Sequence, residues 1–300
     1  MNLYQKGKEK IKKSILRFTR HLVPLMPKGK SLMINMVLAL VGNKFEDEII
    51  LKDGRKFYIK EISPINRSLF FLNKYENHET RIIEKLVKAE DYVFDIGANF
   101  GWYTILMSRL VGKLGKVFAF ELVPSITEEL NKNISLNHLD NVTAENMGVG
   151  EHEGEGKYFY SENWGTGNLK PAMLGGALKE GRIKMTSLDK YVEKNNIKKV
   201  SFIKCDIDGA EVLFLRGARK ILASEKPAIV IEAHERGQRA QGHSCQEIFT
   251  ELQQFGYKFF SLDNKLKAVL NEELEKFDPS FVDNILCLPD GKLDLLSKVL

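Results

Sequence analysis

Short apolar runs alternate with amphipathic stretches over most of the chain after residue 90, and this alternation constrains the fold more than any other feature. The apolar runs predict strands at 92–96, 117–121, 142–149, 200–205 and 228–231, and closing strands at 257–262 and 284–288. The intervening stretches predict helices, among them 102–111, 124–138, 209–223 and 246–255. Strands joined by single helices form parallel βαβ units, and continuous apolar runs are typical of strands buried on both faces. The sequence therefore predicts an α/β fold with a parallel sheet between helices.

The composition is that of an ordinary folded protein, since 43% of its 300 residues are hydrophobic and 28% are charged. This excludes collagen-like, disulfide-scaffold and wholly disordered chains. The three cysteines lie far apart and form no CxxC pair, so the sequence holds neither a zinc knuckle nor a thioredoxin-type motif. We expect reduced thiols and a cytoplasmic protein.

Positive charge is concentrated in residues 1–30, which hold nine lysines and arginines and a single acid, Glu9. Because the whole chain carries only +5, the remainder is slightly acidic. A duplex-binding domain has an overall basic excess. We therefore expect no nucleic-acid partner.

Residues 1–42 combine a basic helix with an apolar stretch. Apolar side chains recur at helical spacing among the basic ones, at Ile11, Ile15, Phe18 and Leu22. Such a helix can dock on its own protein, or it can lie on an anionic membrane surface. Residues 32–41 are too short for a membrane span, which needs about 20 residues, and predict a buried helix with an interfacial anchor as the alternative. Peripheral membrane contact through residues 1–42 is thus an open alternative.

Other local signals complete the domain organisation. The pair Asp53-Gly54 predicts a hairpin, because both residues can take the positive φ angles of a two-residue turn. A helix is predicted at 76–90. Residues 150–182 are rich in Gly, Asn and Glu and predict a long irregular segment, which is usually functional or disordered. We divide the chain into a helical and hairpin extension at 1–70 and a main domain at 71–300.

A glycine-containing turn follows the strand at 92–96. Gly97 and Gly101 allow a sharp bend and a close approach to a ligand, and the following helix offers free N–H groups at its start. Asn99 replaces the second glycine of GxGxxG, which argues against a dinucleotide and against hydride transfer. Glu121 ends the next strand, where a carboxylate can accept both hydroxyls of a ribose. The pattern predicts the nucleoside end of a cofactor site.

Five sequence blocks stand in a characteristic order. They are FDIGANFGWYT at 94–104, FELVP at 120–124, NISLN at 133–137, SLDKY at 187–191 and FIKCDIDGAE at 202–211, followed by 227–232. Over about residues 75–262 the chain resembles the FkbM-type family of S-adenosylmethionine-dependent methyltransferases. Two departures, Val123 where the family more often has Pro and Asp208 where it more often has Glu, remove no chemical group, since Pro124 and a carboxylate are retained.

The resemblance implies a class I methyltransferase fold, with a seven-stranded, mostly parallel sheet that contains one antiparallel strand and is flanked by helices. It implies S-adenosyl-L-methionine as methyl donor and a hydroxyl as the usual acceptor. The expected partner is therefore a small molecule or glycan with a hydroxyl group, and the predicted function is O-methylation of a sugar, glycan or secondary metabolite. The motifs do not name the acceptor.

The predicted cofactor site gathers around the turn and the neighbouring strand ends. Asp95 and Asn99 would fix the polar end of the cofactor through the loop, and Glu121 would hold the ribose. Asn146 and Met147 are weaker candidates to flank the adenine. The full set is Asp95, Gly97, Ala98, Asn99, Gly101, Tyr103, Glu121, Asn146, Met147 and Asp206.

The predicted catalytic residues end the fourth and fifth strands. Methyl transfer is an in-line displacement that depends on alignment, and an alcohol needs a base or a metal near its oxygen. His234 is the first choice for the base because it titrates near neutral pH, with a structural, hydrogen-bonded histidine as the alternative. Asp206 and Glu232 complete the set; they could instead hold a divalent cation, but without a set spacing we assign no metal ligand. Residues 161–176 would form an acceptor lid.

Two rival functions keep the same fold. A non-catalytic binding or scaffold protein, tethered by its N-terminal arm, would bind the cofactor without turnover. A nucleic-acid methyltransferase would use the basic arm, but the sequence shows no interleaved aromatic and basic motif for base stacking. Asp208 and Glu211 have a structural alternative, since acids stabilise the N-terminus of a helix.

Overall fold

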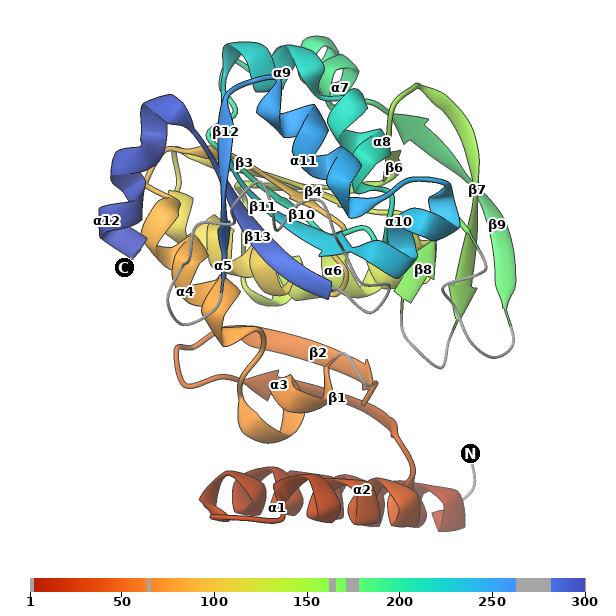
Figure 1. The fold of residues 1–300 in the computed structure, drawn as a ribbon. Helices are drawn as coiled ribbons and strands as arrows, with labels where there is room; N and C mark the ends of the chain where they lie inside the picture. Colours follow the sequence, from red (N-terminus) through yellow and green to blue (C-terminus); the bar gives the residue numbers. More distant parts are fainter. Residues whose placement is uncertain (1–2, 64–65, 162–165, 171–177, 263–281, 300) are drawn as a thin grey trace. The chain divides into compact units, whose positions relative to one another are not determined.

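The computed structural model describes residues 3–63, 66–161, 166–170, 178–262 and 282–299, which form two compact units, Met1–Tyr75 and Glu76–Leu300 (Figure 1). The first unit contains α1 (Leu3–Leu22), η1 (Val23–Leu25), α2 (Lys30–Val41), β1 (Lys44–Ile50), β2 (Lys56–Glu61) and α3 (Arg67–Leu72). Helices of the second unit are α4 (Asn77–Leu86), α5 (Trp102–Val111), α6 (Pro124–Leu136), α7 (Leu188–Lys194), α8 (Glu211–Arg216), α9 (Arg219–Ser224), α10 (Glu235–Gln241), α11 (Cys245–Gln253), η4 (Asp290–Leu295) and α12 (Leu296–Val299).

A seven-stranded sheet forms the centre of the second unit, in the order β12-β13-β11-β10-β3-β4-β5. Its strands are β3 (Tyr92–Ile96), β4 (Lys116–Glu121), β5 (Val142–Asn146), β10 (Phe202–Cys205), β11 (Ala228–His234), β12 (Tyr257–Ser261) and β13 (Val282–Pro289). The strands run parallel except β13, which pairs antiparallel with both β11 and β12. This confirms the predicted class I α/β fold.

Helices cover both faces of this sheet (Figure 1). The helices α5 and α6 contact β3, β4 and β5 on one face, with α4 beside α5, whereas α8 and α11 contact β11 on the other. Because β3, β4, β10 and β11 are parallel and adjacent, their carboxyl ends lie along one edge, where ligands bind in open α/β sheets.

One apolar core is formed by side chains of the main sheet and of α7, α8 and α11. Phe94 and Phe118 stack at 4.9 Å between ring centroids, and Tyr191 of α7 packs edge-on against Phe120 at 4.8 Å. Offset and edge-on aromatic pairs stabilise a core beyond the area that they bury. The cysteines Cys205, Cys245 and Cys287 are free and buried in this core.

The predicted irregular segment at 150–182 is wrong over its described part, which is largely β-structure. Strands β6 (Gly148–Val149), β7 (Gly154–Ser161), β8 (Thr166–Asn168) and β9 (Lys179–Thr186) form a second sheet in the order β6-β9-β7-β8. The glycines of this segment suggested loops, but they lie in strands opposite bulky side chains: a Cβ at Gly156 would overlap Met185, and one at Gly181 would overlap the Tyr158 ring. Trp164 and most of the expected lid at 161–176 lie outside the described residues.

Two predicted elements are each divided in the structure. The expected strand at 142–149 is shared between β5 of the main sheet and β6 of the second sheet. The expected helix at 209–223 is broken into α8 and α9 near Gly217, which approaches the Gly150 carbonyl too closely for any side chain. The Asp189 carboxylate then accepts the Lys220 and Ile221 amides at 2.9 and 3.0 Å and caps α9.

The hairpin of the first unit is present, but its turn differs from the prediction. Strands β1 and β2 pair antiparallel, and the Leu51 amide donates to the Arg55 carbonyl at 2.8 Å, which leaves three residues in the loop. Gly54 alone has a positive φ, of 82°, and its amide donates to the Leu51 carbonyl at 3.0 Å. A type I turn followed by a left-handed glycine is the usual three-residue hairpin loop.

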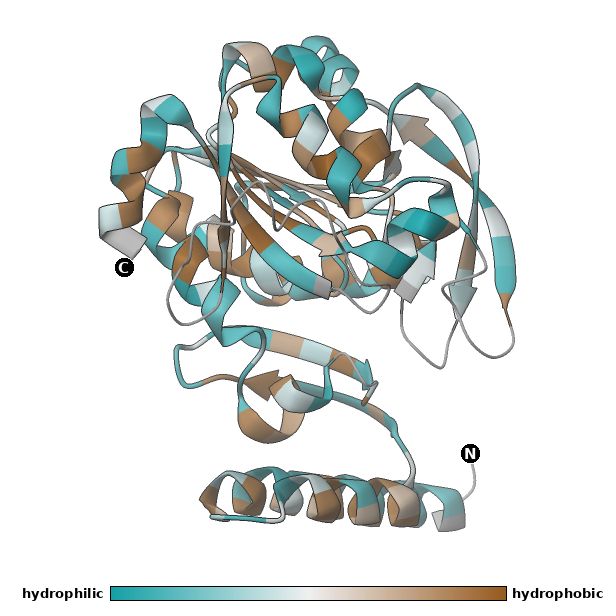
Figure 2. Cartoon of the chain, viewed as in Figure 1, coloured by the Kyte–Doolittle hydropathy of each residue, from teal (hydrophilic) through white to brown (hydrophobic). Residues whose placement is uncertain are grey.

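The paired helices α1 and α2 of the first unit carry apolar residues along their length (Figure 2). The helix expected at 32–41 is present as part of α2, but its expected burial is wrong, because Ile34 is the only buried residue of α2, whereas Leu32, Met36 and Leu40 are 61 to 78% exposed. In α1, Leu16 and Thr19 are buried against the rest of the unit. Over the residues that the structure describes, we find no helix with the combined length and apolar character that a bilayer span requires.

Candidate active site

The loop after β3 is pressed between neighbouring strand ends. The Gly97 and Ala98 amides donate to the Phe120 carbonyl at 3.0 and 2.9 Å, which ties the loop to β4. Gly97 has a φ of +85°, and a Cβ there would overlap the Asp206 carbonyl oxygen. Only glycine tolerates both this backbone conformation and this contact. The glycine therefore sets how closely the loop approaches the end of β10.

Two buried polar side chains anchor the loop. Asp95 is 1% exposed, and its carboxylate accepts the Thr104 hydroxyl at 2.5 Å. Burial raises the pKa of Asp95 to about 6, although this hydrogen bond acts in the opposite direction. Asn133 is fully buried and donates to the Phe100 carbonyl at 2.8 Å. Asp95 thus holds the loop in place, and its predicted action on the cofactor through that loop stays a prediction.

Glu121 lies at the end of β4 with both carboxylate oxygens engaged. One oxygen accepts the Asn99 amide at 3.0 Å and the other accepts the Val123 amide at 2.8 Å. Burial raises the pKa of Glu121 to about 7, against these hydrogen bonds. The Leu122 amide also interacts with this carboxylate, so three backbone amides face its roughly four acceptor positions, which leaves one for a ribose hydroxyl. The assignment to the ribose stays a prediction.

The two asparagines of the predicted cofactor set, Asn99 and Asn146, bond to the backbone. The Asn99 side-chain oxygen accepts the Phe100 amide at 2.8 Å, and Gly101 precedes the first residue of α5. The exposed Asn146 donates to the Glu121 carbonyl at 2.9 Å and so connects the ends of β4 and β5. These contacts give the loop and the strand ends a defined shape.

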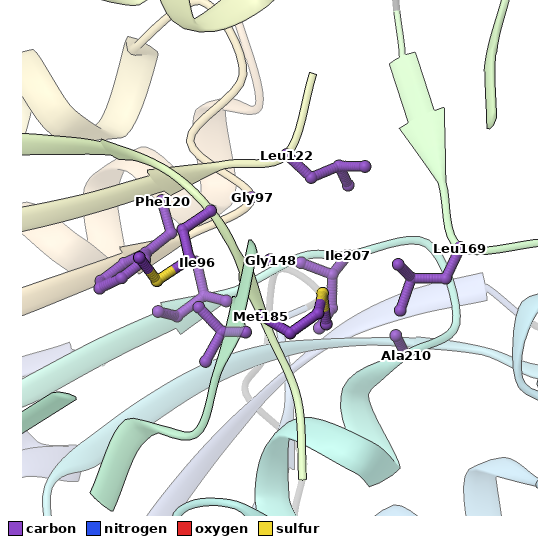
Figure 3. Close-up of a pocket in the computed structure, with 11 residues that line it drawn as sticks. Ile96, Gly97, Phe120, Leu122, Gly148, Leu169, Met185, Ile207 and Ala210 are labelled. Carbon is purple, nitrogen blue, oxygen red and sulfur yellow. The ribbon is translucent and has the colours of Figure 1, made fainter. Parts of the chain in front are cut away.

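An apolar pocket opens beside the loop (Figure 3). It is lined by Ile96, Gly97, Phe120, Leu122, Met147, Gly148, Val149, Leu169, Met185, Ile207 and Ala210. Of the predicted cofactor residues, Gly97 and Met147 belong to this lining, and Glu121 does not. Sequence reasoning assigned no role to Leu122 or Met185. Mostly apolar walls beside a few polar groups are typical of sites that bind small molecules and cofactors.

Charged and polar side chains gather near the ends of β10 and β11, around the buried Lys204, and we call them the polar cluster. Its members are Glu76, Tyr103, Lys204, Asp206, Asp208, Glu232, His234 and Asn284. The Lys204 ammonium donates to the Asp206 carboxylate at 3.1 Å and to the Asn284 side-chain oxygen at 3.0 Å. Burial favours the neutral amine, but Asp206, Glu76 and Glu232 outweigh it and raise the pKa of Lys204. Lysine within the apolar run of β10 was the available signal, and sequence reasoning assigned it no role.

Tyr103 belongs to this cluster and is not part of the pocket lining. Its hydroxyl donates to the Glu76 carboxylate at 2.6 Å, and the Lys204 ammonium lies 5.6 Å from the centre of its ring. A cation at this distance from an aromatic ring is attracted to it. Its predicted contact with the cofactor is not tested by this geometry.

Glu232, His234 and Asp208 approach one another at the end of β11. Each offers one atom to a shared position, and these atoms all lie within 4.8 Å of one another, so the three could hold a divalent cation. The Glu232 Oε2 atom is buried and has no hydrogen-bond partner among the described residues. Burial and the charges of Asp206 and Asp208 raise the pKa of Glu232 well above its ordinary value. Sequence reasoning paired Glu232 with Asp206, which the structure joins to Lys204 instead.

His234 and Glu211 have different surroundings. Burial lowers the pKa of His234, and the charge of Arg236 acts in the same direction, so the imidazole is neutral near pH 7. Glu211 is fully buried; its carboxylate accepts the Ile207 amide at 2.9 Å and the Gln238 side-chain amide. Glu211 therefore joins α8 to α10 and holds the segment between the pocket and the polar cluster.

Comparisons with known proteins identify one family for most of the second unit. The family model described as the methyltransferase FkbM domain matches residues 95–259. "Methyltransferase 1" of Beauveria bassiana is 25% identical over 146 residues, which cover 43% of this chain and 58% of that protein. The hexuronic acid methyltransferase AglP of Haloferax volcanii is 26% identical over 159 residues, which cover 53% of this chain and 62% of that protein.

A solved structure, of methyltransferase FkbM from Methylobacillus flagellatus, has a TM-score of 0.44 and 18% identity and covers 67% of this chain and 44% of that one. The chain spans about three fifths of the length of the two curated relatives. The family model covers more than half of the chain, from Asp95 to Phe259. This chain belongs to the FkbM family of methyltransferases.

Proposed function

We propose that this protein is an S-adenosylmethionine-dependent O-methyltransferase that acts on a hydroxyl of a sugar, glycan or secondary metabolite. The observation that carries the proposal is the position of the segment 206–208. Ile207 lines the apolar pocket, while Asp206 and Asp208, on either side of it, belong to the polar cluster. A donor site and an acceptor site that share one short segment suit a transfer whose rate depends on alignment. The likeness to a hexuronic acid methyltransferase supports a sugar as the acceptor class.

The residues around the loop fit the nucleoside part of the donor. The apolar pocket would take the adenine, and the remaining acceptor position of Glu121 would accept a ribose hydroxyl. Gly97 belongs to the lining of this pocket, so its backbone would contact the donor. When bound, S-adenosylmethionine supplies a methyl group on a positively charged sulfur.

The surroundings of the predicted catalytic residues in the polar cluster support a different role for each. His234 is neutral near pH 7 and is the group that would accept the proton of the acceptor hydroxyl. Asp206 is held by Lys204, so it would orient groups and would not act as the base. Glu232, whose pKa is raised by burial, would hold a proton and donate a hydrogen bond to the acceptor. The Asn168 side chain donates to the Asp208 carbonyl at 2.7 Å and ties the second sheet to the same segment.

The donor assignment is tested by calorimetry of the pure protein with S-adenosylmethionine and S-adenosylhomocysteine. We expect both to bind and to compete, and Glu121→Gln to weaken binding by about tenfold to a hundredfold. Glu145→Gln is the matched control, because Glu145 lies on the neighbouring strand β5 and bonds to Tyr191 at 2.9 Å. Absence of heat and of competition would remove the proposal.

The chemical step is tested with a labelled methyl donor and a panel of hexuronic acids, neutral sugars and phenolic or alcoholic metabolites. We expect one class to be labelled, and His234→Asn to slow labelling by about a hundredfold or more with unchanged donor affinity. If the protein binds the donor but labels no acceptor, and His234→Asn changes nothing measurable, the alternative of a non-catalytic scaffold protein is favoured.

The same cluster allows a metal-assisted form of this step. A divalent cation on Asp208, Glu232 and His234 would lower the pKa of a bound hydroxyl. Calorimetric titration with Mg²⁺ or Mn²⁺ alone separates the two forms. Binding that Asp208→Asn abolishes supports the cation, and its absence leaves His234 as the base.

A further inference from the structure

The exposed large apolar side chains gather in the first unit. Of the ten such residues in the described part of the chain, eight belong to residues 1–75. They are Ile11, Phe18, Leu22, Leu25, Leu32, Met36, Leu40 and Ile50, with exposures from 37 to 80%. An exposed apolar surface of this kind marks a site of interaction with a protein or a membrane.

These side chains form a stripe on each of the two helices. Ile11, Phe18 and Leu22 are seven and four residues apart in α1, which places them on one face of an α-helix. Leu32, Met36 and Leu40 follow a spacing of four in α2 and share a face in the same way. Leu25 extends the stripe into the connecting η1.

The opposite faces of both helices hold the first unit together. Leu16 of α1 and Ile34 of α2 are buried, and each lies roughly half a turn from the exposed stripe of its helix. Arg20 donates to the Phe70 carbonyl at 3.0 Å and to the Asn73 side chain at 2.7 Å, next to α3. Arg67 of α3 donates to Asn35 of α2 at 3.1 Å. The packing of this unit therefore leaves the apolar stripes on its outer surface.

Basic side chains border the exposed stripe of α1 and follow that of η1. Lys8 and Lys10 lie on either side of the α1 stripe at helical spacing, and the exposed Lys28 follows Leu25. Residues 1–30 carry nine lysines and arginines and one acid. Apolar residues bordered by cations suit a surface with anionic headgroups above hydrocarbon, because each type of group meets its complement there.

We propose that the outer face of α1, η1 and α2 docks on an anionic membrane surface, with the apolar stripes below the headgroups and the lysines among them. The helices would lie along the interface. This binding is independent of the proposed methyl transfer, since it uses no residue of the pocket or of the polar cluster.

The experiment is sedimentation of the full-length protein with vesicles of equimolar phosphatidylglycerol and phosphatidylcholine, and with phosphatidylcholine vesicles alone. We expect binding to the anionic vesicles, weakened by added salt. The triple variant Phe18→Ser, Leu25→Ser, Met36→Ser should lower the partition coefficient by about tenfold or more. Leu114→Ser is the matched control, because Leu114 is 70% exposed in the second unit, and it should leave partitioning unchanged.

A second variant set tests the charge. Lys8→Gln, Lys10→Gln and Lys28→Gln together should lower partitioning into anionic vesicles by about tenfold or more. The same three changes at the exposed Lys113, Lys184 and Lys198 of the second unit should have little effect. Equal sedimentation of the wild type with and without vesicles, or of the wild type and both variants, would overturn the proposal. A dimer that the apolar variant dissociates, without vesicle binding, would assign the face to a second copy and would overturn it also.

Discussion

The two units differ in which side chains they bury. The second unit buries a lysine, whereas the first unit leaves leucine and methionine side chains exposed to solvent. Lys204 is 1% exposed, whereas Leu40 is 78% exposed. In the second unit, carboxylates around Lys204 compensate the loss of water. In the first unit, two helices on one side of a hairpin leave their outer faces without a covering layer. Burial thus follows from what packs on a residue, and hydrophobicity alone does not determine it.

The largest effect is expected where the second unit buries its charge. Lys204→Met would leave Asp206 and Glu232 without their cation and should lower the free energy of unfolding by about 3–5 kcal/mol. Lys199→Met is the control, because Lys199 is 56% exposed and pairs with Asp91 at 3.1 Å, and it should cost no more than about 1 kcal/mol. Denaturant unfolding measures both. Equal costs would mean that the buried cluster does not depend on its lysine.

The next effect compares two positions of α2 that lie two residues apart. Ile34→Ala removes a side chain that is 5% exposed and should destabilise the first unit by about 2–5 kcal/mol. Met36→Ala removes one that is 61% exposed and should change stability by no more than about 0.5 kcal/mol. Hydrogen exchange of the α1 and α2 amides follows the first unit by itself. A large cost at Met36 would show that the outer face is covered in solution.

The pH dependence of stability sharpens the comparison at Glu121. Burial holds the folded-state pKa of Glu121 at about 7, above its ordinary value of 4.5, so the folded protein keeps a proton that the unfolded chain has released between these values. The free energy of unfolding of the wild type should therefore fall relative to that of Glu121→Gln as the pH rises from 4.5 to about 7. The expected slope is about 1 kcal/mol per pH unit, and the difference should become constant at higher pH. Thermal unfolding of both proteins from pH 4.5 to 8 checks this. Parallel curves would contradict it.

The smallest effect is expected on ligand binding by the second unit when surface residues of the first unit are substituted. The triple Ser variant of Phe18, Leu25 and Met36 should bind S-adenosylhomocysteine with an affinity within about twofold of the wild type, since distant sites act independently. Deletion of residues 1–30 should have the same result, but it also removes the buried Leu16 and Val23, so surface substitutions are cleaner. Weaker binding in the Ser variant would couple the two units.

Much of the main sheet and of the loop after β3 could be predicted, because their strands, helices and bend depend on sequence patterns that are local. The strand at 92–96, the helix at 102–111 and the bend at Gly97 depend on apolar runs, helical spacing and glycine. The second sheet was missed because the Gly, Asn and Glu content of residues 150–182 suggested an irregular segment, although Gly156 and Gly181 each face a bulky partner from another strand. Their meaning depends on residues that are distant along the chain.

The sequence by itself determined the strands and helices of the main sheet, the bend at Gly97 and the carboxylates at the strand ends, because these follow from short-range patterns. Only the tertiary structure decided which groups meet. It joined Asp206 to Lys204, brought Asp208 beside Glu232 and His234, and gave both oxygens of Glu121 to backbone amides. The physical reason is that burial, pairing and pKa depend on the neighbours that folding assembles, and no local pattern encodes those neighbours.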